Sequence, residues 1–541
     1  MAHFIDARAT LVNDALDGLI AASGGRLARL DGDPGIRVVL RAELNSSKVA
    51  VVSGGGSGHE PAHAGFVGPG MLSAAVCGDV FASPSVDAVL AGILAVTGPA
   101  GCLLVVKNYA GDRLNFGLAA ERARALGHRV ETVIVSDDIA LPDAKQPRGV
   151  AGTLFVHKVA GHAAEAGVPL EDVAALARRA AEAAKSLGIA VSTCTIPGSP
   201  RSERLEEGQA ELGLGIHGEP GVERIALPPA GELALMMAER LSGTVTGDRL
   251  ALLVNNLGST SALEMQILTR AVLATDLGKR VRLLIGPAPL MTALDMHGAS
   301  LSVLPLDDAL EAALVAPVPL PAWPGAVRIV PPTLHPIPEG LAGETFTPSQ
   351  DPVTSARIAA VARALIAAEA KLNALDAKVG DGDAGTTFAG AARAVLADLE
   401  GLPQADPAAL CRALAERIGR AVGGSSGVLG SIFFAAAAAA FADGAAWPDA
   451  LALGVARVQG YGGAKQGDRT LLDALIPAVD AVKGGDLSAA AQAAHAGAEA
   501  TAGMDRAGAG RSSYLASGDL AGVQDPGAAG VAEAFAALAS V

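Results

Sequence analysis

Three aspartates lie within one short segment, LDAKVGDGDAGTTF: Asp376, Asp381 and Asp383, with only Lys378 near enough to offset their charge. The interleaved glycines predict a tight loop after a helix. Carboxylates packed this closely repel one another unless a cation joins them, and hard oxygen ligands suit magnesium, which keeps phosphate oxygens and waters in its other positions. A solvated acidic turn is the alternative. A calcium loop of the EF-hand kind fits poorly, because the twelfth position from Asp381 is Ala392 and not glutamate.

Glycine-led helix starts accompany this loop in the same half of the chain. GGSSG at 423–427 precedes an apolar run, and small residues there would let backbone amides reach phosphate oxygens, favoured by the helix dipole. Glycine and serine also simply begin helices. Gly467–Arg469 is predicted to open a helix, and Arg511 and Asp525–Gly527 fall in loops near the C-terminus. Gathered at one end of a bundle, these segments would form a nucleotide cradle; separately, they are ordinary caps and turns.

The N-terminal half carries two polar loops that follow predicted strands. SGGGSGHEP offers backbone amides around Gly56 beside the imidazole of His59. It has neither the Gly-Lys-Ser/Thr ending of a Walker loop nor GxGxxG leading directly into a helix, so these nucleotide sites are disfavoured. KNYAGDRLNFG places Lys107 and Asp112 after the next strand, which brings an acid or base close to His59 if the two strands are neighbours. A capping role for Asp112 on a helix starting near Asn115 is the alternative.

Glycines surround His217 in GLGIHGEPG. They remove steric cover, so that a ligand can reach the ring, and a neutral imidazole nitrogen exposed to a pocket can attack a carbonyl. A metal site is disfavoured, because we find no further histidine, aspartate or glutamate in register. A histidine that only makes hydrogen bonds within its loop is the commoner case across proteins.

Residues 38–135 must position the first two of these loops. Continuous apolar runs end in glycine or polar residues and alternate with alanine-rich helical segments at 85–95 and 116–126. Such runs predict a parallel sheet covered on both faces, with ligands bound where loops leave the carboxyl ends of the strands.

A second α/β block follows a long helix expected over 170–187. Its strands are predicted at 251–255 and 281–285, and it ends near Ala316. Repeated proline then forbids helix and favours extended backbone. We therefore divide the chain into an α/β domain at 1–316, subdivided near 185, a proline-rich linker at 317–352 and an all-helical domain at 353–541.

In the helical domain, glycine or proline interrupts the helical pattern at regular intervals, alanine is abundant, and no segment resembles a strand. We expect roughly eight helices, the first at 355–376. The longest apolar run, 432–442, is about half the length that a membrane-spanning helix needs, so we interpret it as a buried helix and expect no membrane span.

Charge and cysteine usage narrow the class of protein. The 41 basic and 56 acidic residues give a net charge of −15, which repels nucleic acid and anionic membranes but not metal-bridged phosphates. The cysteines at 77, 102, 194 and 411 show neither CxxC nor zinc spacing, which favours reduced thiols in a cytoplasmic protein. The first residues include acidic ones where a signal peptide needs an apolar run.

Taken in order, SGGGSGHEP, KNYAGDRLNF, GLGIHGEPG, VNNLG, GDGDAGTT, GGSSG, GDRTLLDAL, GRSSYL and DPGA resemble the motifs of the dihydroxyacetone kinase family, over nearly the whole chain apart from the linker. The chain resembles the fused, single-chain, ATP-dependent type, and nothing in it resembles the phosphocarrier module of the other type. The resemblance implies a two-part α/β sugar-binding domain followed by an all-α eight-helix barrel that binds ATP. It also implies a cytoplasmic homodimer that acts in glycerol metabolism.

The resemblance implies roles for individual residues as well. His217 would form a covalent hemiaminal with the ketone carbonyl, Asp112 would be the base on the hydroxyl to be phosphorylated, and His59 would be its partner. The other sugar-lining positions are Gly56, Ser83 and Lys107. Two magnesium ions on the ATP phosphates would be held by Asp376, Asp381 and Asp383. The ATP-binding positions are Asp381, Gly382, Asp383, Ala384, Ser425, Ser426, Gly467, Arg511, Asp525, Pro526 and Gly527.

The expected activity is ATP-dependent phosphorylation of dihydroxyacetone to dihydroxyacetone phosphate. Two departures from the family pattern stand out: QPRGVAG replaces the GRRGLAG of many relatives, in a loop that we connect with substrate choice, and Ala384 stands where some relatives have histidine or cysteine. The alternatives are a kinase for erythrulose or D-glyceraldehyde, an FAD-AMP lyase (cyclising) side activity of the helical half, and a ketose-binding regulator without turnover, which the intact aspartate set disfavours.

Overall fold

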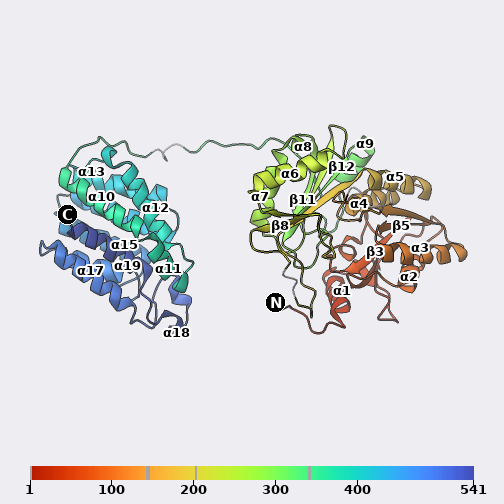
Figure 1. Ribbon diagram of the computed structural model, residues 1–541, viewed down its shortest axis with the longest axis horizontal. Coiled ribbons are helices and arrows are strands. Elements are labelled where there is room, and N and C mark those ends of the chain that lie inside the picture. Colours follow the sequence, from red (N-terminus) through yellow and green to blue (C-terminus); the bar gives the residue numbers. More distant parts are fainter. Residues whose placement is uncertain (1–2, 142–145, 201–203, 339–340, 342) are drawn as a thin grey trace. The chain divides into compact units, whose positions relative to one another are not determined.

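The computed structural model describes residues 3–141, 146–200, 204–338, 341 and 343–541, except for the side chains at 424–426 and 517. The chain forms two compact units, Met1–Thr333 and Leu334–Val541 (Figure 1). In the part of the chain that is described, no helix is both long and apolar enough to cross a membrane.

The first unit contains two sheets, and the N-terminal one has the strand order β1-β2-β4-β3-β5-β6. Its strands are β1 (Leu27–Arg29), β2 (Val38–Arg41), β3 (Ala50–Ser57), β4 (Ala74–Val80), β5 (Cys102–Lys107) and β6 (Val130–Val135). The strands from β3 to β6 pair in parallel, as their continuous apolar runs predict. The edge strand β1 pairs antiparallel with β2, and β2 pairs antiparallel with β4, which the sequence did not suggest.

Helices cover both faces of this sheet. They are α1 (Leu11–Ala22), α2 (Val86–Val96), α3 (Ala110–Ala125), α4 (Thr153–Glu165) and α5 (Leu170–Ala183). Residues of α2 and α3 share one apolar core with the sheet, and residues of α1, α4 and α5 share the core on the opposite face.

Two predicted helix boundaries in this region were wrong. The helix expected over 116–126 is α3, which begins at Ala110 and therefore includes Asp112 in its first turn. The helix expected over 170–187 ends at Ala183, because the next residues form a strand whose Leu187 and Ile189 are buried in the second sheet. Tertiary pairing here overrides a local pattern that suits either structure.

The second sheet has the order β13-β11-β10-β12-β7-β8-β9. Its strands are β7 (Lys185–Ala190), β8 (Gln209–Leu212), β9 (Glu223–Ala226), β10 (Leu250–Asn256), β11 (Val281–Ala288), β12 (Gly298–Pro305) and β13 (Ala326–Arg328). The helices of this part are α6 (Ala230–Ser242), α7 (Ala262–Leu273), α8 (Asp276–Lys279) and α9 (Asp308–Val315). The two strands predicted at 251–255 and 281–285 are confirmed. They form the one parallel pair among the named strands of a sheet that is otherwise antiparallel.

Each end of the predicted linker at 317–352 packs against the unit next to it. Trp323 is 5% exposed and its ring packs edge-on against Phe66, and β13 pairs with β11 at the edge of the second sheet. The first unit therefore continues to Thr333, because a proline-rich segment is extended and can still supply an edge strand and a buried aromatic anchor. At the other end, Phe346 packs against the core of the second unit.

The second unit is all-helical over its described residues. Its helices are α10 (Pro352–Ala367), α11 (Glu369–Val379), α12 (Ala384–Ala397), α13 (Pro407–Ala421), α14 (Gly424–Ala442), α15 (Trp447–Gly462), α16 (Leu472–Val482), α17 (Leu487–Thr501), α18 (Ser517–Leu520) and α19 (Pro526–Ala539). The helix predicted over 355–376 is divided at Ala368 into α10 and α11. If these two count as one bent helix and the single turn α18 is set aside, eight long helices remain, as predicted.

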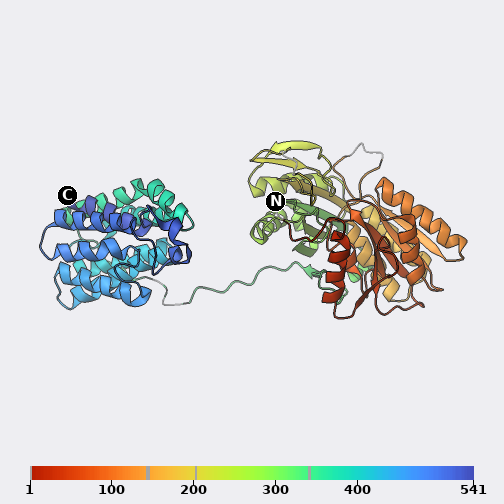
Figure 2. The same cartoon turned by 90° about the horizontal axis from the view of Figure 1, so that it is seen from below.

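These eight helices form a closed ring. Each packs against the next in the order α10, α12, α13, α14, α15, α16, α17, α19, and α19 returns to α10, so that the helices lie side by side in both views (Figures 1 and 2). The apolar run 432–442 lies on α14 and is buried only in part: Ala437 is fully buried, whereas Ala435 and Ala439 are exposed, so this helix is not buried on all sides as predicted. The unit is therefore a helical barrel.

Candidate active site

The loops that carry the candidate nucleotide residues share one end of the barrel. Helices joined by short connections run in alternate directions, so every second connection returns to the same end. Two contacts show that these loops converge: Arg511 forms an ion pair with Asp381, and the backbone N–H of Gly508 donates to the carbonyl oxygen of Asp468 at 2.9 Å. The connections at this end are 380–383, 422–423, 463–471 and 502–525.

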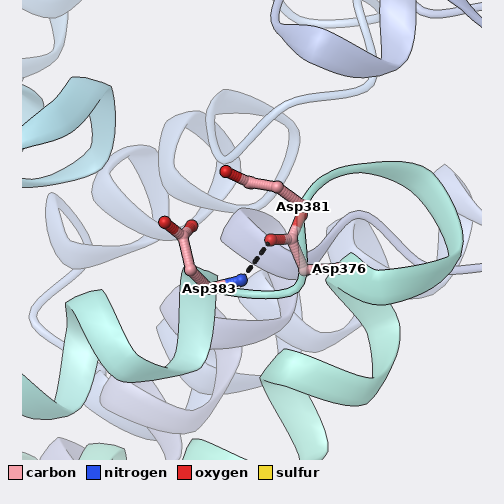
Figure 3. Close-up of side chains that lie close together, drawn as sticks. All are labelled: Asp376, Asp381 and Asp383. Atoms are coloured by element: carbon pink, nitrogen blue, oxygen red, sulfur yellow. Dashed lines mark hydrogen bonds between the residues drawn. The ribbon is translucent and has the colours of Figure 1, made fainter. Parts of the chain in front are cut away.

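The three aspartates of the acidic loop meet in space (Figure 3). One oxygen from each of Asp376, Asp381 and Asp383 lies within 4.8 Å of the others. Asp376 is buried on the last turns of α11, and its Oδ2 accepts hydrogen bonds from the backbone N–H groups of Asp383 (2.9 Å) and Ala384 (3.1 Å). Asp381 and Asp383 are exposed, and Gly382 lies between them. A buried carboxylate thus orders a turn that presents two exposed ones, and this donor set fits magnesium.

Arg511 places a positive charge against this loop. It lies in a one-turn 3₁₀ helix, Arg511–Tyr514, and its ion pair with Asp381 is largely exposed, at 67% and 46% of the two side chains. Exposed ion pairs are weak. The guanidinium is therefore available to a phosphate group that reaches the same loop.

The loop at 463–471 differs from its prediction. Gly467 and Arg469 precede the helix rather than open it, because α16 begins at Leu472. The carboxylate of Asp473 accepts hydrogen bonds from the N–H groups of Gly467 (2.6 Å) and Thr470 (2.8 Å), which fixes the turn.

Asp525 is the N-cap of α19, the last helix of the unit. Its side chain caps α19 by accepting the N–H of Ala528 at 2.8 Å, and Pro526 is the first residue of that helix. Burial raises the pKa of Asp525 to about 6. Gly527 lies against Leu471, so this helix start borders the loop at 463–471.

GGSSG forms the first turn of α14, with Gly423 as the N-cap. The side chains of Ser425 and Ser426 lie outside the described residues. Their backbone belongs to the helix N-terminus, where N–H groups without helical partners favour an anion.

In the first unit, Asp112 lies beside Lys107 and Ser83. β3 and β5 are neighbouring parallel strands, which is the condition for bringing the Asp112 loop close to His59. The carboxylate of Asp112 is buried and accepts a hydrogen bond from the Ser83 hydroxyl, so it does not cap its helix. Burial lowers the pKa of Lys107, and the charge of Asp112 partly offsets this effect.

Gly56 lies at the carboxyl end of β3, where only glycine fits. A Cβ at this position would lie 2.7 Å from the backbone nitrogen of Ala82 and 2.9 Å from the backbone of Phe81. The close approach brings the strand end against the turn that carries Ser83.

His59 is fully buried and uncharged. Its Nδ1 donates to the carbonyl oxygen of Thr292 at 2.7 Å, which leaves Nε2 with its lone pair. Burial, with the nearby charges of Lys107 and His217, lowers the pKa of His59 well below 6.5. A neutral ring with a free acceptor nitrogen can take a proton from a hydroxyl group.

His217 stands at the centre of a group of rings. Its ring centroid lies 4.8 Å from that of His59, 5.3 Å from that of Phe81 and 4.5 Å from that of Tyr109, each edge to face. The structure thus brings His217 and His59, which lie far apart in the sequence, into direct ring contact. Nδ1 of His217 lies 3.1 Å from Oε1 of Glu219, so the ring has a carboxylate partner within its own loop.

Four residues of this site were missed in the sequence: Glu219, Phe81, Tyr109 and Thr292. Glu219 stands two residues from His217 in GLGIHGEPG, and this spacing was a sufficient signal for a pairing inside a tight turn. Thr292 follows β11 in the distant second sheet, and nothing in its local sequence indicates its contact with His59.

Buried neutral histidines make the first unit sensitive to acid. His157 is fully buried, and burial, with the charge of Lys107, lowers its pKa to about 3. The unfolded chain takes up this proton below pH 6.5 and the folded chain does not, so the free energy of unfolding falls as pH falls from 6.5 towards 3, by about 1.4 kcal/mol per pH unit for each such group.

His157→Leu is therefore expected to flatten the loss of stability between pH 6.5 and 4.5. Urea unfolding in a Trp447→Phe background, which leaves only Trp323 as a fluorescent tryptophan in the first unit, measures the difference. Equal slopes for the variant and its parent would contradict a neutral buried His157.

A Dak1 domain model matches residues 17–322, and a DAK2 domain model matches residues 378–540. The dihydroxyacetone kinase of Citrobacter freundii is 51% identical over 99% of this chain and 98% of its own. Triokinase/FMN cyclase of Homo sapiens is 41% identical over 99% and 98%. The crystal structure of the C. freundii kinase in complex with AMP-PNP and Mg²⁺ matches at a TM-score of 0.72 and 49% identity, over 100% of this chain and 99% of that one.

An α/β unit with clustered histidines, followed by a helical barrel with a carboxylate loop, defines a two-domain phosphotransferase. The chain belongs to the dihydroxyacetone kinase family, in its fused, single-chain, ATP-dependent type.

Proposed function

We propose that this chain phosphorylates dihydroxyacetone with ATP to give dihydroxyacetone phosphate and ADP. The observation that carries the proposal is His217, whose Nδ1 is paired with Glu219 and whose Nε2 is left to react, within a cluster that also holds His59. The 51% identity to the Citrobacter kinase over the full chain supports the same substrate.

The substrate is held as a hemiaminal. Nε2 of His217 bonds to the carbonyl carbon, and the carbonyl oxygen becomes a hydroxyl group. This bond selects carbonyl compounds over polyols such as glycerol, and it fixes the sugar so that the transfer becomes an oriented event. Ser83, Lys107 and Gly56 line the sugar beside it.

Asp112, with His59, takes the proton of the terminal hydroxyl as its oxygen bonds to the γ-phosphorus of ATP. Asp376, Asp381 and Asp383 would hold two magnesium ions, which when bound neutralise the charge on the phosphates. The convergent loops would hold the nucleotide through Gly467, Arg511, the GGSSG helix start and the Asp525–Gly527 turn.

Two further candidate activities have support. The human relative's name pairs triokinase with FMN cyclase, so cyclisation of flavin adenine dinucleotide by the helical half is a second candidate. It would not need His217. Erythrulose and D-glyceraldehyde are alternative acceptors, since each carries a carbonyl group for the same histidine.

A homodimer in the cytoplasm completes the proposal, with the nucleotide unit of one subunit serving the sugar unit of the other. Mixing His217→Ala protein with Asp383→Asn protein tests this arrangement. If the units work across subunits, reassociated heterodimers regain a fraction of the wild-type rate. Transfer confined to one subunit gives no recovery.

The acceptor is identified by ADP release with ATP and magnesium against dihydroxyacetone, D-glyceraldehyde, both erythruloses and glycerol. We expect turnover with dihydroxyacetone and none with glycerol. Turnover with glycerol as fast as with the ketose would overturn the hemiaminal. If no carbonyl sugar is phosphorylated, the proposed kinase activity is refuted, and a flavin nucleotide cyclase or a ketose-binding regulator becomes the favoured function.

A further inference from the structure

The carboxylate of Glu219 contacts His217 at two points, the ring and the backbone. Oε1 lies 3.1 Å from Nδ1 of the ring, and Oε2 accepts the backbone N–H of His217 at 2.9 Å. The backbone N–H of Gly215 donates to the carbonyl oxygen of Glu219 at 3.2 Å, which closes the turn around the histidine. The ring is thereby fixed in position relative to its own backbone.

The carboxylate of Glu219 stays charged. Burial alone would raise its pKa, but the hydrogen bonds from His217 and the charge on that ring outweigh the burial and lower the pKa of Glu219 to about 2. A charged carboxylate only accepts hydrogen bonds. The ring nitrogen that faces this carboxylate must therefore donate, so that a His217 ring with a single N–H proton carries it on Nδ1 and has the lone pair on Nε2.

Arg148 holds the other side of this turn. Its Nε donates to Oδ2 of Asp138 at 2.7 Å, and its Nη2 donates to the carbonyl oxygen of Gly213 at 2.7 Å. A Cβ at Gly215 would collide with both the Glu219 carboxylate and the Arg148 guanidinium, so these two charges lie against the same glycine. Arg148 comes from the QPRGVAG loop, which thus supports the His217 turn from the first sheet.

We propose that Glu219 is a positioning residue that holds His217 in the Nδ1–H tautomer and stabilises the positive charge of the ring once it has bonded to the ketose. The inference rests on the proposed function. As the Nε2–carbon bond forms, the π electrons of the carbonyl move to its oxygen, which takes a proton from solvent. The ring keeps its Nδ1 proton and becomes an imidazolium beside the carboxylate.

Glu219→Gln tests this role because it keeps the shape of the side chain and removes one acceptor. An amide has a single acceptor oxygen. When that oxygen takes the backbone N–H of His217, the amide N–H₂ faces Nδ1 and favours the Nε2–H tautomer, whose Nε2 has no lone pair to react.

The measurement is ¹⁵N NMR of the full chain labelled at histidine, with His217→Ala identifying the resonances of His217. In wild type without ketose we expect the Nδ1–H tautomer, and in the Gln variant a shift towards Nε2–H. The KM for dihydroxyacetone is expected to rise at least tenfold in the variant, with a smaller change in kcat and no change in the KM for ATP.

Glu499→Gln is the matched control. His495 and Glu499 form an exposed histidine–glutamate pair at 3.3 Å on α17, outside the sugar-binding unit, so this change should leave the His217 tautomer and the ketose KM unaltered. An unchanged tautomer and a ketose KM within twofold of wild type in Glu219→Gln would overturn the role of Glu219. The tautomer is measured in the free protein, so it is tested even if wild type turns over no ketose, an outcome that would refute the proposed function instead.

Discussion

Asp383→Asn is expected to lower kcat for phosphoryl transfer by about 10³-fold or more. A magnesium ion contributes several kcal/mol to the stabilisation of charge in such reactions, and each 1.4 kcal/mol corresponds to about a factor of ten. The exposed Asp383 side chain makes no capping hydrogen bond to α12, so its loss should leave the barrel folded. Steady-state ADP release at saturating magnesium measures the effect, and chelation of magnesium should reproduce it in wild type.

Asp443→Asn provides the control for this prediction. Asp443 is an exposed aspartate at the end of α14, in a connection at the other end of the barrel, so the same change of charge there should leave kcat within twofold. Comparable losses in the two variants would mean that general electrostatics, rather than a metal site at the acidic loop, sets the rate.

His217→Ala is expected to lower kcat/KM for dihydroxyacetone by about 10³-fold, because the substrate loses the bond that orients it for transfer. Nucleotide affinity should not change, since the candidate ATP residues all belong to the other unit. The preference for dihydroxyacetone over glycerol should fall to the level that noncovalent binding of the two acceptors alone provides. Parallel kinetic assays with both acceptors, and calorimetric titration with a non-hydrolysable ATP analogue, measure these effects.

His297→Ala is the corresponding control. His297 pairs with Glu264 at 2.9 Å in the same unit, and it is not among the residues of the ketose site. If His297→Ala matched the loss in His217→Ala, the effect would belong to the stability of the unit and not to a covalent role.

The loops that carry the candidate site residues could be predicted from the sequence because the side chains in each loop are close along the chain. Asp376, Asp381 and Asp383 lie within eight residues, and the structure brings them together as predicted. The approach of Asp112 to the site around His59 required only that β3 and β5 be neighbours, which is common for successive parallel strands.

Contacts between segments that are distant along the chain could not be predicted from the sequence. The ion pair of Arg511 with Asp381 depends on how the helices close into a ring, and helical periodicity carries no such order. The hydrogen bond of His59 to Thr292 depends on the packing of one sheet against a segment from the other. Most strands of the second sheet were missed as well, because short antiparallel strands such as β8 and β9 lack a long apolar run.

The proposed reaction moves the γ-phosphoryl group of ATP to a ketose held on His217. Following the reaction by ³¹P NMR with ATP, magnesium and dihydroxyacetone tests it most directly, with His217→Ala and Asp383→Asn run beside wild type. We expect a sugar phosphate resonance to grow in wild type in step with ADP and to be absent from both variants over the same period. ADP with only inorganic phosphate in wild type, or an undiminished sugar phosphate signal in His217→Ala, would contradict it.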